Sequence, residues 1–351
     1  MLPGIYGEFS NGEIKTDAFA HSCNTFVMFQ EIDDRSKLKL SLKAAQLYYL
    51  QDLTMEYIGK ELNVSRSSVS RLLQMARDRG IVEIKVNTPD DTPRRIASQL
   101  KDKYGVSAHL VPVAETTSHV ERLDRVALSA ARMLPGFFST RMTMGIAWGS
   151  TITAVSRNLT RRHVGESRIV QLNGAGNDHT TGVIYSGEIL RRFGEAFGSV
   201  VEQFPVPAFF DDPAAKKILW KEMSIKRILD IQGSLDVALF GLGALHAEVP
   251  SHVYAAGYLN QDDLDGLNRD NVVGDVATVF FREDGTWEDV ALNQRSSGLD
   301  LDILKRTPRR ICVVAGTARL QSLHGALAGN LITDLIIDDE TAKALLSDSS
   351  N

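Results

Sequence analysis

The fold of the N-terminal part of the chain is decided by residues 41–86, SLKAAQLYYLQDLTMEYIGKELNVSRSSVSRLLQMARDRGIVEIKV. Apolar side chains at helical spacing over 44–50 predict one face of a first helix. Thr54 is suited to cap a second helix that extends through Leu62. Asn63 then begins a short turn, so the segment predicts two helices joined closely to a third.

The third helix begins after Ser65, which can act as its N-cap, and ends before Gly80. Its apolar positions face inward, and its outward-facing side chains with the cap are Ser65, Arg66, Ser67, Ser70, Arg71 and Gln74. Arginine reads guanine edges, and serine and glutamine donate or accept hydrogen bonds in a DNA groove. The alternating run IVEIKV, 81–86, predicts a short strand that could form a wing. The pattern is typical of a winged helix-turn-helix domain, whereas a basic surface helix of a small bundle is the alternative.

Charge is distributed unevenly along the chain. The whole chain carries a net charge of −5, but residues 35–88 contain ten Lys/Arg and five Asp/Glu, a local net charge of +5. The remainder therefore carries −10. A basic module on an acidic body favours DNA binding by the module alone.

The rest of the chain follows a different pattern. We interpret residues 1–35 as a tail, 36–87 as the helix-turn-helix domain and 88–93 as a linker within the polar run NTPDDTP. Residues 94–348 alternate helical and strand patterns, which predicts a large Rossmann-like α/β domain with a mostly parallel sheet covered on both faces.

Several expected strands of this domain end in glycine-containing turns. The turns are Gly149-Ser150-Thr151, Asn173-Gly174-Ala175-Gly176, Gly241-Leu242-Gly243 and Ala315-Gly316-Thr317. Such turns gather at the carboxyl edge of a parallel sheet, where backbone N–H groups can approach an anion. We therefore expect a pocket for a small phosphorylated or polyhydroxy ligand, although each turn alone could be purely structural. Trp148 could line this pocket or pack in the core, and Asp275 could accept sugar hydroxyls or act as a cap.

Catalytic and metal motifs are lacking in the sequence. The eight histidines show no H-x-x-x-H spacing, and there is no CxxC, Gly-x-Ser-x-Gly or Walker A motif. We expect no catalytic residues, no metal and no cofactor. The two cysteines and the absence of a signal-peptide pattern or a long apolar run predict a cytoplasmic protein without a membrane span.

The helix-turn-helix stretch resembles the N-terminal module of the SorC family of sugar-responsive bacterial regulators, most specifically in SRSSVSRLL (65–73) and RDRGIV (77–82). Further segments resemble the effector domain of that family in the same order. They are GIAWGST, LNGAGN, VALFGLGAL, VVGDVATVFFREDG, LNQR, AGTARLQSLHGAL and LIIDDETAKALL. The resemblance covers about residues 38–347.

The resemblance implies an effector domain shaped like phosphosugar isomerases but without catalysis. It also implies a homodimer or homotetramer that binds double-stranded operator DNA with inverted half-sites and responds to a sugar or polyol phosphate. The family usually has a second glycine and a lysine after the last glycine turn, whereas here the segment is one residue shorter and Arg319 is the only nearby cation. The expected effector-binding residues are Gly149, Ser150, Thr151, Asn173, Gly174, Gly241, Gly243, Asp275 and Arg319.

Two alternatives are enzymes. A phosphosugar isomerase-type enzyme with an accessory DNA-binding head would need a carboxylate or histidine base, for which Asp275 and His246 are the candidates. A recombinase would need a nucleophilic Ser or Tyr beside an arginine cluster, or a metal-binding carboxylate triad, and neither is evident.

Overall fold

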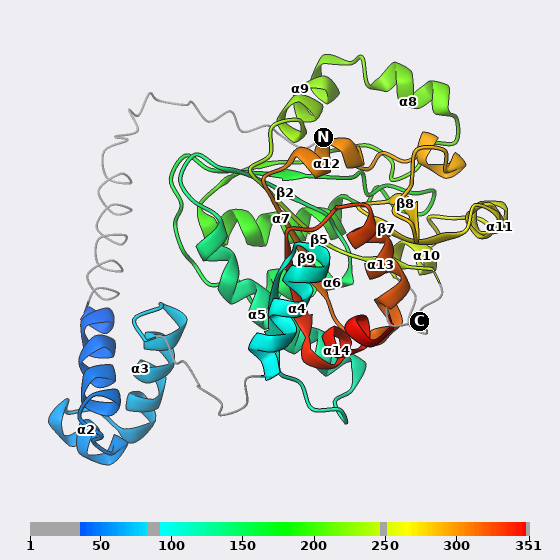
Figure 1. Cartoon of the computed structure of the whole chain (residues 1–351). Helices are drawn as coiled ribbons and strands as arrows, with labels where there is room; N and C mark the ends of the chain where they lie inside the picture. Colours follow the sequence, from blue (N-terminus) through cyan, green and yellow to red (C-terminus); the bar gives the residue numbers. More distant parts are fainter. Residues whose placement is uncertain (1–35, 83–91, 246–250, 349–351) are drawn as a thin grey trace, which may run out of the picture. The chain divides into compact units, whose positions relative to one another are not determined.

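The chain divides into two compact units, separated between Asn87 and Thr88 (Figure 1). The computed structural model describes residues 36–82, 92–245 and 251–348. Each unit has its own apolar core. Within the described residues, no helix is both long and apolar enough to cross a membrane.

The described residues of the first unit form three helices, residues 36–49, α2 (Met55–Glu61) and α3 (Arg66–Asp78). Both predicted caps are confirmed, because Thr54 accepts from the Tyr57 N–H and Ser65 accepts from the Ser68 N–H. Residues 83–86, most of the expected wing strand, lie outside the described residues.

The core of the first unit is made by apolar side chains at helical spacing. The fully buried members are Ala44, Ala45, Ile58, Val69, Leu73 and Ala76. The Ser41 hydroxyl donates to the Leu72 carbonyl at 2.8 Å and links the first helix to α3. Packing of this kind holds short helices that would be marginal in isolation. It also orients the polar face of α3 outward.

The second unit is built on a seven-stranded parallel sheet of order β1-β10-β9-β5-β2-β3-β4. Its strands are β1 (Ser107–Val111), β2 (Thr143–Ile146), β3 (Arg168–Gln171), β4 (Val200–Glu202), β5 (Val237–Gly241), β9 (Arg309–Val314) and β10 (Asp334–Asp338). A separate antiparallel sheet contains β6 (Gly243–Ala244), β7 (Val272–Val276) and β8 (Val279–Arg282). The predicted mostly parallel α/β architecture is confirmed.

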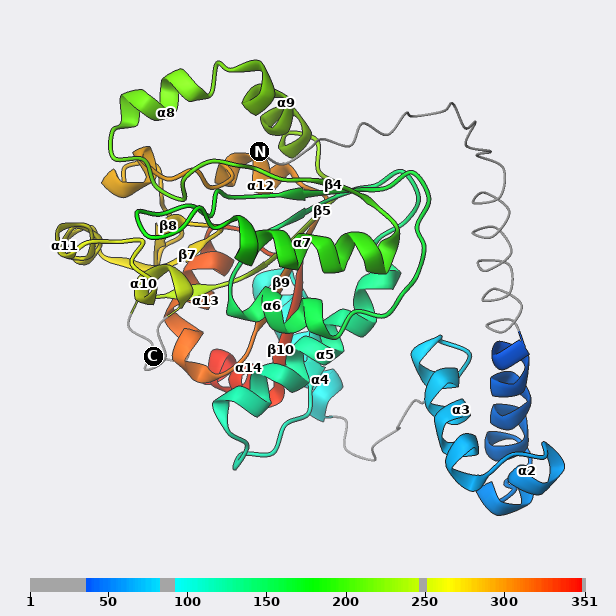
Figure 2. The same cartoon turned by 180° about the vertical axis from the view of Figure 1, so that it is seen from behind.

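Helices cover both faces of the parallel sheet (Figures 1 and 2). One face carries α5 (His119–Phe137), α6 (Ser150–Arg157) and α7 (Val183–Phe197). The other carries α4 (Thr92–Tyr104), α9 (Met223–Gln232), α12 (Leu301–Arg306), α13 (Leu320–Ala328) and α14 (Asp339–Ser347). Successive strand residues alternate between these faces, as Leu239 and Phe240 do in β5, because strand side chains have a period of two.

The remaining short elements lie in the connections of the second unit. They are α8 (Pro213–Leu219), α10 (His252–Ala255), α11 (Gln261–Arg269), η1 (Ala291–Gln294) and η2 (Thr317–Arg319). Sequence patterns did not indicate β4 or the antiparallel sheet. Helix α4 begins at Thr92, so Thr92 and Pro93 belong to this helix rather than to the expected linker. Proline is well tolerated in a first helical turn, where its missing N–H leaves no bond unmade.

The order of strands reverses between β2 and β5. From β2 the chain continues to β3 and β4 on one side, and from β5 it continues to β9 and β10 on the other. β2 and β5 are hydrogen-bonded neighbours, with Ile146 opposite Leu239. A crevice opens outside the carboxyl ends of parallel strands at such a reversal, and ligands bind there in open α/β sheets.

Candidate functional site

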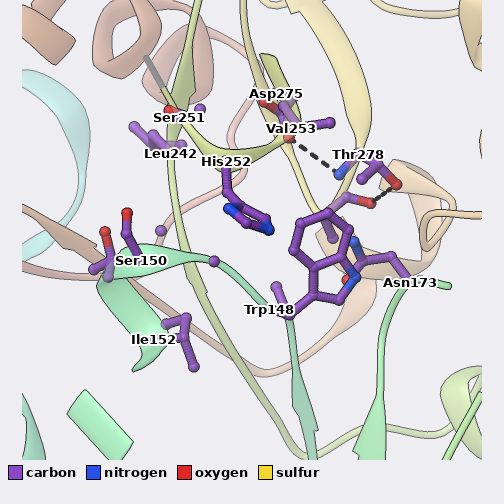
Figure 3. Close-up of a pocket in the computed structure, with 16 residues that line it drawn as sticks. Trp148, Ser150, Ile152, Asn173, Leu242, Ser251, His252, Val253, Asp275 and Thr278 are labelled. Carbon is purple, nitrogen blue, oxygen red and sulfur yellow. Dashed lines mark hydrogen bonds between the residues drawn. The ribbon is translucent and has the colours of Figure 1, made fainter. Parts of the chain in front are cut away.

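A pocket lies at this reversal, where the turns after β2 and β5 meet the antiparallel sheet (Figure 3). It has about 460 Å³ of space between atoms, its open mouth included. Its lining residues are Ala147–Ile152, Asn173, Gly241–Gly243, Ser251–Val253, Asp275, Ala277 and Thr278. The walls therefore come from five separate parts of the chain.

Two glycines are needed for the shape of the pocket. Gly149 precedes α6 with a φ of 146°, a conformation that side chains disfavour. A Cβ added to Gly243 would lie 1.7 Å from the Asp275 Oδ1, so no other residue fits against this carboxylate. The first-turn N–H groups of α6 follow Gly149 directly and provide donors at the positive end of the helix dipole.

Asp275 is a buried carboxylate in the wall of the pocket. It lies in β7 opposite Gly243 and accepts hydrogen bonds from the Tyr254 hydroxyl at 3.0 Å and the Thr278 N–H at 3.1 Å. Burial raises the pKa of this carboxylate to about 6, whereas the two hydrogen bonds act to lower it. The carboxylate therefore has both the acceptor oxygens for ligand hydroxyls and a titration close to neutral pH.

Asn173 presents a buried amide to the pocket. Its side chain is 1% exposed, and neither its Oδ1 nor its Nδ2 has a hydrogen-bond partner within the described residues. Buried polar atoms are nearly always paired, because an unpaired one costs about 1–3 kcal/mol. An unpaired donor and acceptor on a pocket wall are therefore suited to a polar ligand.

Aromatic side chains form the wall beside Asn173. Figure 3 shows the His252 ring next to Trp148, and their ring centroids are 5.8 Å apart. Trp148 also stacks on Tyr258 at 5.1 Å and donates from its Nε1 to the Gly174 carbonyl. Trp148 is thus both a buried core residue and a lining residue. Burial lowers the pKa of His252, which favours the neutral imidazole.

Arg319 lies outside the lining of the pocket but contacts its wall. The guanidinium donates to the Leu242 carbonyl at 3.3 Å and the Ala315 carbonyl at 3.4 Å. It is 6% exposed, burial lowers its pKa, and no carboxylate in the described part of the chain forms an ion pair with it. A buried cation without a counter-charge is costly, so an anion beside it would be favoured.

The structure brings most of the predicted effector residues together. Gly149, Ser150, Thr151, Asn173, Gly241, Gly243 and Asp275 line one pocket. Gly174 and Arg319 do not line it. Gly174 lies behind the wall, where its N–H donates to the Ser297 hydroxyl. Sequence reasoning missed Ser251, His252 and Thr278, which no turn motif or spacing marked.

The predicted DNA-contacting residues lie on α3 and at its N-cap. Ser65, Arg66, Ser67, Ser70, Arg71 and Gln74 are all exposed. Arg66 Nε forms an ion pair with Glu56 of α2 at 2.8 Å, and Arg71 donates to the Ser67 carbonyl. Both arginines therefore lie on the exposed side of α3, and an exposed ion pair such as Arg66–Glu56 contributes little to stability.

Comparison with known families covers both units. Residues 91–347 match the family described as "Putative sugar-binding domain", and residues 45–79 match "Sigma-70, region 4". The deoxyribonucleoside regulator of Bacillus subtilis (strain 168) is 33% identical over 315 residues, which cover 90% of this chain and 99% of that protein.

Solved structures show the same architecture. A domain of a possible sugar-binding transcriptional regulator from Arthrobacter aurescens TC1 is 49% identical, with a TM-score of 0.69, and covers 74% of this chain and 100% of its own. The full-length sorbitol operon regulator SorC from Klebsiella pneumoniae is 26% identical, with a TM-score of 0.66, and covers 89% of this chain and 99% of its own. The similarity therefore extends over both units.

Proposed function

This chain belongs to the SorC family of sugar-binding transcriptional regulators, and we propose that its effector is a small phosphorylated sugar or polyol bound in the pocket at the carboxyl ends of β2 and β5. It is a DNA-binding regulator under the control of a sugar. The observation that carries the proposed site is the convergence of seven effector-type residues on one pocket at the sheet reversal.

The chemistry of the pocket supports a polyhydroxy ligand. The Asp275 carboxylate and the unpaired Asn173 amide offer acceptors and a donor for hydroxyl groups. The α6 N-terminus and the buried Arg319 support an anionic group on the same ligand, because both favour negative charge. Trp148 offers an apolar face for the carbon skeleton of the sugar.

For DNA recognition we propose that α3 enters the major groove. Arg66, in the first turn of α3, would read a base edge, and Arg71 would contact a phosphate. Because one small head reaches few base pairs, specific binding requires two heads related by symmetry. We therefore propose a homodimer or homotetramer on inverted half-sites, acting in the cytoplasm, where the operator DNA of a bacterium lies.

The enzyme alternative receives no support from the relatives. The deoxyribonucleoside regulator and the sorbitol operon regulator, which align over nearly their whole lengths, are regulators. Of the two candidate bases, Asp275 accepts from Tyr254 and Thr278, and His246 lies outside the described residues.

Operator titrations with and without sugar phosphates and polyol phosphates test the proposal. We expect Ser150→Ala and Arg319→Ala to bind operator normally and to lose the response to the ligand that acts on the unchanged protein. A full response of both variants at unchanged ligand concentration would place the pocket elsewhere. Loss of DNA binding by folded variants would contradict the separation of the two functions.

A second titration tests the recognition helix. Arg66→Ala should lose about 1–3 kcal/mol of binding to the operator but not to unrelated DNA, because it removes a base contact. Arg71→Ala should weaken binding to all sequences alike. Unchanged operator binding by both variants would refute the role of α3.

A further inference from the structure

We propose that two copies of this chain pair through the α8 arm, residues 213–223, with the arm of each copy lying in a groove of the other. The inference rests on the symmetric assembly that the proposed function includes. It adds the surface through which the copies pair, which that assembly does not specify. The arm stands away from the parallel sheet in both views (Figures 1 and 2).

The arm exposes apolar side chains on its outer side. None of the residues of α8 is buried. Ile218 is 64% exposed and Met223 is 85% exposed. The inner side is held by Trp220, whose ring lies 5.7 Å from Phe204 and 5.4 Å from Phe210. A seven-residue helix that buries no residue gains little stability from its own chain, so its outer side is suited to a partner.

A groove lies directly beside the arm. It has about 1170 Å³ of open space between α8, α9, the start of α12 and the segment around Trp287. Its apolar lining residues are Trp220, Leu229, Val279, Trp287, Leu299, Leu301 and Ile303. Glu288, Asp300 and Asp302 line the same groove, and Lys216 of the arm lines it on the other side, so the acidic groups outnumber the basic one. The groove thus fits a segment that is apolar and basic.

The arm has these two properties. Its exposed lysines, Lys217 and Lys221, form no ion pair with any carboxylate in the described part of the chain. The acidic groove and the basic arm belong to the same unit and lie next to each other. In a pair related by two-fold symmetry, the arm of the first copy contacts the groove of the second, and the arm of the second contacts the groove of the first. A single rotation therefore forms both contacts at once. Charge complementarity within a single patch therefore favours a second copy over an unrelated protein.

Sedimentation of the full chain tests the surface. We expect Ile218→Glu combined with Met223→Glu to weaken self-association at least tenfold, because it places charge in an apolar contact. The matched control is Ile184→Glu in α7, whose side chain is 88% exposed and should leave assembly unchanged. Unchanged assembly of the double variant, or equal weakening by the control, would overturn the proposal.

A charge exchange makes the test independent of stability. One variant carries Lys217→Glu and Lys221→Glu, and a second carries Glu288→Lys and Asp302→Lys. Each alone should self-associate at least tenfold more weakly, because its own arm and groove then repel. An equimolar mixture should form heterodimers, since both arm–groove contacts become attractive again. Two folded variants that do not pair on mixing would contradict the arrangement.

The same measurements separate this inference from the proposed function. A strictly monomeric unchanged chain, with and without operator DNA, would refute the symmetric assembly and this surface together. An unchanged chain that assembles, with variants that assemble equally well, would refute only the surface.

Discussion

Two buried amides of similar exposure have opposite roles, which the structure alone distinguishes. Gln171 donates to the Asn173 carbonyl at 2.7 Å and accepts from the Phe204 N–H at 3.2 Å. The Asn173 amide, by contrast, is unpaired within the described residues. Polar residues so close in the sequence thus divide into one that supports the fold and one that is available to a ligand.

We predict that Asn173→Leu leaves the free energy of unfolding unchanged or raises it by about 1 kcal/mol, because it removes an unpaired buried group. The same change should abolish the response to effector. Its control is Gln171→Leu, which should lower the free energy of unfolding by about 1–3 kcal/mol by orphaning two backbone groups. Denaturant unfolding of both variants measures the difference. Equal destabilisation by the two changes would show that Asn173 is structural.

We predict that Asp275 makes the stability of the folded protein depend on pH. Its pKa is about 6 in the folded protein, above the ordinary 3.8. Between about pH 4 and 6 the folded state therefore binds more protons than the unfolded state at this group, so its contribution favours folding at low pH and is lost as the pH rises through 6. We expect Asp275→Asn to abolish this pH-dependent contribution to the free energy of unfolding, which amounts to about 3 kcal/mol. The variant should therefore be more stable than the unchanged chain at pH 7.

Unfolding of both proteins between pH 4 and 8 would measure this effect. Parallel stability curves for Asp275→Asn and the unchanged chain would mean that the carboxylate titrates at its ordinary pKa.

At the scale of elements, short-range signals define the helix-turn-helix unit. The Ser65 hydroxyl accepts from the Ser68 N–H at 3.1 Å and so fixes the first residue of α3. We predict that Ser65→Ala lowers the stability of this unit by about 1 kcal/mol and weakens operator binding. Ser70→Ala, at an exposed position inside the same helix, is the control and should change stability by less than about 0.5 kcal/mol. Thermal unfolding followed by circular dichroism compares the two, and an equal effect would contradict the cap.

The antiparallel sheet illustrates the opposite case. β6 contains only Gly243 and Ala244, and it pairs with β7 from a distant part of the sequence. Two residues are too few to show the alternation of apolar and polar side chains that identifies a strand, and no nearby sequence signal indicates the strand with which they pair. Yet this pairing places Asp275 against Gly243, which makes it the most consequential short element for the pocket.

At the scale of the whole molecule, the two units have separate cores and opposite charge tendencies. We predict that residues 92–348 alone fold cooperatively and retain the rise in melting temperature caused by the effector, because ligand binding stabilises only the folded state. They should not bind operator, since the basic head is absent. Differential scanning fluorimetry and a gel-shift assay measure the two outcomes. An isolated second unit that does not fold would contradict the separation of the units.

The sequence by itself determined the helix-turn-helix, its caps, the alternation of helices and strands and the glycine turns. These features depend on side-chain period and on backbone preferences within a few residues, so they are visible without the fold. It also predicted seven of the residues that line the pocket, because turns after parallel strands share one edge of a sheet.

Only the tertiary structure decided which of these groups meet. The strand order places β2 beside β5, leaves Asn173 unpaired, buries Arg319 behind the Leu242 carbonyl and brings His252 to Trp148. Each of these outcomes depends on contacts between residues far apart in the chain. Burial then sets the pKa of Asp275, since desolvation depends on what surrounds a carboxylate and not on its neighbours in sequence.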